Sequence, residues 1–130
     1  MTSGTGIQPR CGEIWFARLP TDPPDKGPRP VVVVSPDHRN QNVRATTILV
    51  VPFSTTLTEG VAAHVRLNPG ETGLRETCEA QPENIAVLRK EHLQAPRSPL
   101  RRLGRHRILE IARGVIFALD FLPEDLLELR

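Results

Sequence analysis

A proline-rich segment that leads directly into a run of valines places the strongest constraint on how this chain can fold. Residues 20–30 hold five of the chain's 13 prolines. Proline fixes φ and lacks a backbone N–H, so this segment cannot form a helix or a central strand. The sequence therefore predicts a long exposed loop, a kind of segment that often carries function. The loop ends at Val31–Val34, a β-branched run that predicts a strand buried on both faces.

Further β-rich runs accompany this strand, and a helical pattern appears only near the C-terminus. Strands are predicted at residues 12–19, 46–53 and 61–67 and near 76–80 and 84–88, with polar loops at 37–45 and 54–60. A helix is predicted over 105–119, with a buried face made of Ile108, Ile111, Ala112, Val115 and Leu119. Pro123 followed by two acids predicts a short second helix. This order favours a mainly β fold, a small antiparallel β-barrel with an appended C-terminal helix.

The length of 130 residues fits one domain, which we expect over residues 11–130 after a flexible tail at 1–10. No apolar run reaches the roughly 20 residues of a membrane span, and no secretion signal is recognisable. We therefore expect a cytoplasmic protein without a membrane partner. Cys11 and Cys78 are predicted to be reduced thiols, and a disulfide between them is an unsupported alternative.

The basic residues are unevenly distributed, although the net charge is only +2. Residues 97–107 contain five arginines and one histidine and no acidic residue. One interpretation is a track for phosphate groups that uses Arg101 and Arg102. The other is a solvated face at the start of the helix, where cations oppose the helix dipole.

Several short motifs occur in an order that is typical of one protein family. They are Gly12-Glu13-Ile14-Trp15, Gly27-Pro28-Arg29-Pro30-Val31-Val32-Val33-Val34, Val50-Val51-Pro52-Phe53-Ser54-Thr55, Gly73-Leu74 ahead of Cys78, Asn84-Ile85, and the helix with Ile108 and Ile111. Over residues 11–120 the chain resembles the MazF/PemK family, the toxin half of bacterial toxin–antitoxin pairs. The resemblance implies a CcdB/MazF-like fold, an SH3-like barrel that forms a homodimer. It also implies cleavage of single-stranded RNA without a metal or other cofactor, and inhibition by a cognate antitoxin.

Arg29 and Ser54 are the candidate catalytic residues that this resemblance implies. A guanidinium held between two prolines can grip phosphate oxygens and stabilise the charge of the transition state. The Ser54 hydroxyl can bind a phosphate oxygen or orient the 2′-hydroxyl, and Thr55 or Thr56 could take this role instead. The structural alternatives are an ion pair of Arg29 with Asp25 or Glu13, and a turn capped by Ser54.

Other residues are weaker candidates for the same chemistry. Glu76 is a possible general base, or else a solvated acid in a turn, and His38 lies in a polar loop after the second strand. Lys26, Arg75 and Trp15 are candidate RNA contacts, and Trp15 could lie in a groove or at a dimer interface. His64 is predicted to face solvent.

Three functions remain open from the sequence. The first is an RNA-cleaving toxin, and the second is a toxin of the same fold that binds DNA gyrase, like CcdB. The third is a weakened member of the family that only binds RNA. Cys78 and Asn84 leave room for it, because they stand where the family usually has serine and glutamine. The sequence does not predict the cleaved RNA motif, the antitoxin or the general base.

Overall fold

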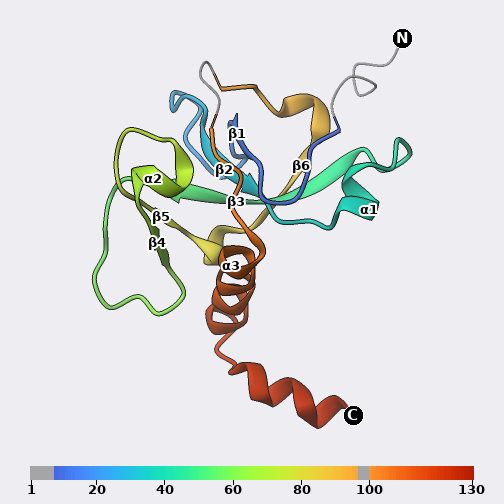
Figure 1. The fold of residues 1–130 in the computed structure, drawn as a ribbon, viewed down its shortest axis with the longest axis vertical. Helices are drawn as coiled ribbons and strands as arrows, with labels where there is room; N and C mark the ends of the chain where they lie inside the picture. The colour runs from blue at the N-terminus through green and yellow to red at the C-terminus, as the bar shows by residue number, and fades with distance from the viewer. Residues whose placement is uncertain (1–7, 97–99) are drawn as a thin grey trace.

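The computed structural model describes residues 8–96 and 100–130, and in these residues six strands form a barrel crossed at one end by a helix (Figure 1). The strands are β1 (Ile14–Ala17), β2 (Arg29–Val33), β3 (Thr47–Ser54), β4 (Val65–Leu67), β5 (Cys78–Ala80) and β6 (Ala86–Arg89). The α-helices are α1 (Asp37–Asn40), α2 (Pro69–Thr72) and α3 (Arg105–Ala118), and the 3-10 helices are η2 (Pro82–Asn84), η3 (Lys90–His92) and η4 (Pro123–Leu129). Most of the tail predicted at 1–10, and Arg97 of the arginine run, lie outside the described residues.

Strand β3 is central to the sheet, because it pairs with β2, β6 and β5 and so connects β1, β2 and β6 with β4 and β5. It pairs antiparallel with β2 along one edge, where Val32 lies opposite Val51. Along the other edge it pairs first with β6 and then, through Phe53 and Ser54, with β5. Pro52 falls between these two pairings, where its missing N–H interrupts neither ladder, and its carbonyl accepts a hydrogen bond from the Gln81 N–H.

The chain after β6 returns to β1 and closes the barrel. Phe16 and Gln94 form an isolated antiparallel bridge with hydrogen bonds in both directions, at 2.9 Å and 2.7 Å. The ring β1–β2–β3–β6 is completed at this bridge. The prediction of a mainly antiparallel β fold with a C-terminal helix is therefore confirmed.

The valine run forms the centre of the core. Val31, Val32 and Val33 have no exposed surface. Successive side chains of a strand point to opposite faces, so Val32 packs in one hydrophobic cluster while Val31 and Val33 pack in the other. Each buried valine contributes about 1.5–3 kcal/mol to stability. The prediction of a strand buried on both faces is confirmed for these three residues.

The structure corrects the element boundaries at three places. The loop predicted at 20–30 ends earlier, because Arg29 and Pro30 already pair with β1. The loop predicted at 37–45 contains the single-turn helix α1. The strand predicted at 61–67 is reduced to β4, because the His64 N–H bonds back to the Val61 carbonyl and forms a turn.

Helix α3 packs through a face that matches the predicted one at Ile108 and Ile111 but also includes Gly114. Ile111 and Gly114 are buried on it, whereas Ala112 and Leu119, both expected on the buried face, are exposed. At Gly114 the helix backbone lies so close to Ala63 that a β-carbon would meet its carbonyl oxygen. A residue without a side chain at this position allows that contact.

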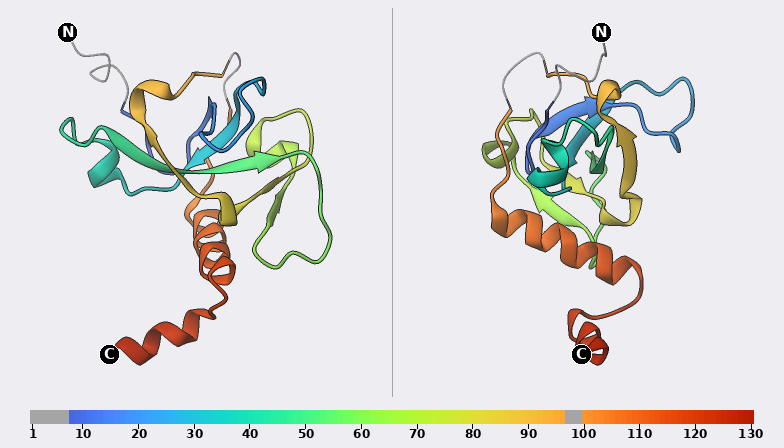
Figure 2. Two further views of the ribbon diagram at one scale, coloured as in Figure 1. Left: turned by 180° about the vertical axis from the view of Figure 1, so that it is seen from behind. Right: turned by 90° about the vertical axis from the view of Figure 1, so that its right-hand side faces the viewer.

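The C-terminal segment lies apart from the barrel, whereas α3 crosses beneath it (Figure 2). The short helix predicted after Pro123 is the 3-10 helix η4, in which no residue is buried. Among the described residues, no helix has both the length and the apolar character needed to cross a membrane.

His64 is buried between two carboxylates, so its predicted exposure to solvent is wrong. Its Nδ1 lies 3.1 Å from Glu79 and its Nε2 lies 2.6 Å from Glu83, and only 8% of its side chain is exposed. Glu79 also accepts hydrogen bonds from the Thr58 N–H and from Arg66. These contacts tie β4, β5, η2 and the 55–64 loop together.

The electrostatics of this cluster favour the charged form of both partners. Burial alone would lower the pKa of His64, but its hydrogen bonds with Glu83 and Glu79 outweigh that effect and raise it. Burial alone would raise the pKa of the Glu79 carboxyl, but the hydrogen bonds that it accepts, first that from the Thr58 N–H, lower it. We therefore expect a protonated His64 that donates from both ring nitrogens.

Replacing Gly114 by alanine will destabilise the protein. Overpacking against Ala63 and Pro82 is expected to reduce the free energy of unfolding by about 1–3 kcal/mol. This outweighs the gain of up to about 1 kcal/mol in helix propensity. Thermal unfolding measures the effect. Gly27→Ala is the control, because no atom lies within 4 Å of a β-carbon at that position, and it should not lower the melting temperature.

Replacing His64 by glutamine will destabilise the protein in a pH-dependent way. A raised pKa in the folded state means that the stabilisation is complete below the ordinary histidine pKa of about 6.5 and is lost as the pH rises through the folded-state value. The difference in melting temperature between wild type and His64→Gln should therefore shrink from about pH 5.5 to pH 9. His106→Gln, at a side chain that is 87% exposed, is the control. A difference that grows with pH would contradict a charged His64.

Candidate active site

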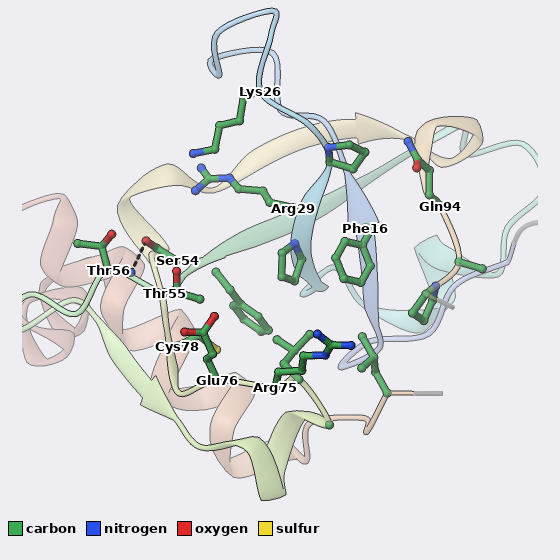
Figure 3. A pocket seen from close by; sticks show the side chains of 18 residues that line it. Phe16, Lys26, Arg29, Ser54, Thr55, Thr56, Arg75, Glu76, Cys78 and Gln94 are labelled. Atoms are coloured by element: carbon green, nitrogen blue, oxygen red, sulfur yellow. Dashed lines mark hydrogen bonds between the residues drawn. The ribbon is translucent and has the colours of Figure 1, made fainter. Parts of the chain in front are cut away.

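An open pocket of about 820 Å³ lies beside the end of β3 (Figure 3). Its walls come from Lys26 and Pro28 of the β1–β2 loop, the start of β2 at 29–30, the β3 end and loop at 53–56, and the segments 73–76 and 94–96. Phe16, Cys78 and Leu100 complete it. The pocket therefore forms where the proline-rich loop, the central strand β3, and the segment that closes the barrel meet.

Arg29 lines the pocket at the first position of β2. Its Nε lies 3.2 Å from Asp22 Oδ2, and the two side chains are only 15% and 12% exposed. The alternative of an ion pair with Asp25 or Glu13 is replaced by this pairing with Asp22. Pairing at the inner edge of the guanidinium leaves its two terminal nitrogens available to a ligand, and in Figure 3 they point toward the end of the pocket that holds Ser54.

Ser54 lines the same pocket at the last position of β3. Its Oγ accepts a hydrogen bond of 3.1 Å from the Thr56 N–H, so the expected turn-capping role is present. A hydroxyl that accepts this bond still has its own proton to donate. Thr55 and Thr56 also line the pocket, so the structure brings all three hydroxyl candidates together.

The charged residues of the pocket are mostly cationic. Lys26, Arg29 and Arg75 line it, against Glu76 as the acidic residue among the lining residues. Arg75 and Glu76 follow Gly73, whose φ of +82° turns the chain after α2. Such a balance suits a ligand that carries negative charge, as phosphate groups do.

Cys78 lies at the base of the pocket but is 1% exposed. Burial raises the pKa of its thiol to about 11, and the nearby Glu71 and Glu79 act in the same direction. The thiol is therefore protonated at neutral pH and is a poor nucleophile. Cys78 and Cys11 are both free, as expected for reduced thiols.

The remaining candidates lie outside the pocket. His38 is exposed on α1, and the Trp15 indole donates to Glu13 at 3.2 Å. Arg101 is exposed, and Arg102 bonds the Cys11 carbonyl beside a second hollow of about 370 Å³. The structure thus leaves these four candidates outside the pocket. The candidates that it brings together in the pocket are Arg29, Ser54, Thr55, Glu76, Lys26 and Arg75.

Two pocket residues had no functional signal in the sequence. Phe16 lies in a strand for which only the neighbouring Trp15 was a candidate RNA contact, and Gln94 lies in an irregular segment. Only the closure of the barrel between β1 and the chain after β6 places both at the pocket. No local pattern in the sequence reports such a contact.

Comparisons with known proteins identify the family of this chain. The model of PemK-like, MazF-like toxins of type II toxin–antitoxin systems matches residues 10–119. Endoribonuclease MazF9 of Mycobacterium tuberculosis is 34% identical over 112 residues, covering 80% of this chain and 87% of MazF9.

Solved structures share the fold. Mycobacterium tuberculosis toxin MazF-mt6 has a TM-score of 0.63 at 22% identity, covering 84% of this chain and 97% of its own. A mycobacterial endoribonuclease in complex with its cognate antitoxin has a TM-score of 0.62 at 20% identity, covering 88% of this chain and 95% of its own. Together with the family match over residues 10–119, these findings show that the chain belongs to the PemK-like, MazF-like toxins of type II toxin–antitoxin systems.

Proposed function

We propose that this toxin is an endoribonuclease that cleaves single-stranded RNA in the pocket beside Ser54 and thereby arrests growth. The observation that carries the proposal is that Arg29 and Ser54 line one open, mainly cationic pocket. The relative at 34% identity is itself named an endoribonuclease. The substrate would be messenger RNA in the cytoplasm.

The proposed reaction is a transesterification within the RNA. The 2′-oxygen forms a bond to phosphorus while the bond from phosphorus to the 5′-oxygen breaks, which gives a 2′,3′-cyclic phosphate and a 5′-hydroxyl. A base takes the proton of the 2′-hydroxyl, and the leaving 5′-oxygen gains a proton. Arg29 stabilises the charge that develops on the phosphate oxygens, and Ser54 donates a hydrogen bond to one of them.

The other pocket residues supply the remaining functions. Glu76 is the carboxylate among the described lining residues, so we assign it the role of proton acceptor. Lys26 and Arg75 hold the adjoining phosphates. Arg101 and Arg102 would extend this path along the surface toward the second hollow. Because Arg29 and Lys26 supply the positive charge, the proposed reaction needs no metal ion.

A cognate antitoxin is the expected protein partner. One mycobacterial neighbour was solved in complex with its antitoxin. An acidic, flexible segment would match the cations of the pocket and compete with RNA for them. A homodimer is proposed on the family resemblance, and Trp15, which is half-buried, stays a candidate for its interface.

The alternatives receive less support from the geometry. A gyrase-binding toxin needs no phosphate pocket, so the placement of Arg29 and Ser54 favours the nuclease. A weakened RNA-binding member was considered because of Cys78 and Asn84. Asn84 lies outside the pocket, with its side chain bonded to Gln81, and the Cys78 thiol is buried beneath the pocket surface. Position 78 thus exchanges a hydroxyl for a buried thiol at the base of the pocket, while the charged residues and the hydroxyls at the end of β3 remain in the pocket.

Replacing Arg29 by alanine should reduce the rate of RNA cleavage by about 10²–10³-fold, because a preorganised donor to the transition state is lost. Ser54→Ala should reduce it by about 10- to 100-fold, since one hydrogen bond to a charged group is lost. Cleavage of a fluorescent RNA measures both. Arg44→Ala, at an exposed arginine remote from the pocket, and Ser54→Thr, which keeps the hydroxyl, are the controls. Full activity of Arg29→Ala would refute the assignment.

The products should carry a 2′,3′-cyclic phosphate and a 5′-hydroxyl, and cleavage should continue in EDTA. An RNA with a 2′-deoxynucleotide at the cleaved position should resist cleavage at that position, because its nucleophile is missing. Mass spectrometry of the fragments identifies the ends. Products with 5′-phosphate ends, or loss of cleavage in EDTA, would contradict the proposed reaction.

A further inference from the structure

The pocket has a second end, formed by a row of three side chains on β1, β2 and the extended chain after β6. Phe16 of β1 lies directly opposite Pro30 of β2 on one side and opposite Gln94 on the other. Directly opposed residues of antiparallel strands present their side chains on the same face of the sheet. All three residues accordingly line the pocket.

This row is held rigidly by the backbone. The Phe16 N–H donates to the Gln94 carbonyl at 2.9 Å, and the Gln94 N–H donates to the Phe16 carbonyl at 2.7 Å. Phe16 is only half-buried and Gln94 is exposed, so both side chains remain accessible from the pocket. In Figure 3 the Phe16 ring and Gln94 lie on the side of the pocket away from Ser54 and Glu76.

The two ends of the pocket differ in chemistry. The Ser54 end combines hydroxyls with the cations Arg29 and Lys26. The Phe16 end combines an aromatic ring with an amide, which has both donors and an acceptor. Single-stranded RNA is recognised by stacking of its bases on aromatic rings and by hydrogen bonds to their Watson–Crick edges. A volume of about 820 Å³ has room for more than a phosphate group.

We propose that Phe16 and Gln94 form a base-recognition subsite, in which one nucleobase next to the cleaved phosphate stacks on Phe16 while Gln94 reads its edge. This inference rests on the proposed ribonuclease function and adds the residues that determine which RNA sequence is cleaved. The phosphate end of the pocket then supplies the chemistry, and the Phe16 end selects which phosphodiester bond is presented to it.

The test compares the cleavage sites of variants in a randomised RNA library, with fragments captured at their 5′-hydroxyl ends and sequenced. Gln94→Ala should weaken the base preference at one position beside the cut and leave the other positions as in wild type. Gln94→Glu should shift that same position toward guanine, because a carboxylate only accepts and guanine presents two donors, N1–H and N2–H₂, side by side. Phe16→Leu should lower kcat/KM by about tenfold or more through loss of stacking.

Controls separate recognition from folding and from the chemistry. Phe121→Leu removes an aromatic ring that is 57% exposed on the C-terminal segment, and it should change neither rate nor preference. Gln94 is exposed, so its variants test the subsite even if Phe16→Leu unfolds. An unchanged preference in both Gln94 variants, with active wild type, would overturn the subsite alone. Absence of cleavage by wild type would overturn the proposed function and the subsite with it.

Discussion

Burial of β2 on both faces is the constraint on which the pocket depends. Val31 and Val33 enter one hydrophobic cluster and Val32 enters the other. A shift of one residue in this strand would exchange the two sets of side chains, so the register is strongly determined. Arg29 lies two residues before this run and opposite Ala17 of β1. The register of β2 therefore also determines the position of Arg29. The backbone position of Arg29 at the pocket wall thus follows from apolar packing in the strand behind it.

Backbone pairing also positions the other pocket residues, at the end of β3 and at the closure of the barrel. Strand β3 brings Ser54 to the point where it leaves β2 and joins β5. The bridge between Phe16 and Gln94 connects β1 to the chain that follows β6. The pocket is therefore assembled from segments far apart in sequence, each placed by backbone hydrogen bonds. Such preorganisation suits a site whose chemistry depends on aligning a phosphate with fixed donors.

The sequence predicts those features that local patterns encode. The valine run predicted β2, whereas Arg29 was a candidate site residue only through the family resemblance, since the residues alone also allowed an ion-paired loop arginine. Gly114 carries no side chain, so apolar periodicity could not reveal that the packed face of α3 includes it. His64 follows an alternating pattern that predicts exposure, and its burial depends on two acids from β5 and η2. Gln94 gave no signal, because its place depends on closure of the barrel.

Charge in the pocket is balanced only in part, and this determines what it can bind. Asp22 is nearly buried and neutralises one edge of Arg29, which keeps a cation stable at 15% exposure. Lys26 and Arg75 lie at the surface of the pocket, where solvent screens them. A polyanion that enters the pocket would displace water from these two cations and meet the fixed N–H donors of Arg29. RNA and an acidic antitoxin segment would present the same kind of charge, so under the proposed function one cationic surface would serve both the reaction and its inhibition.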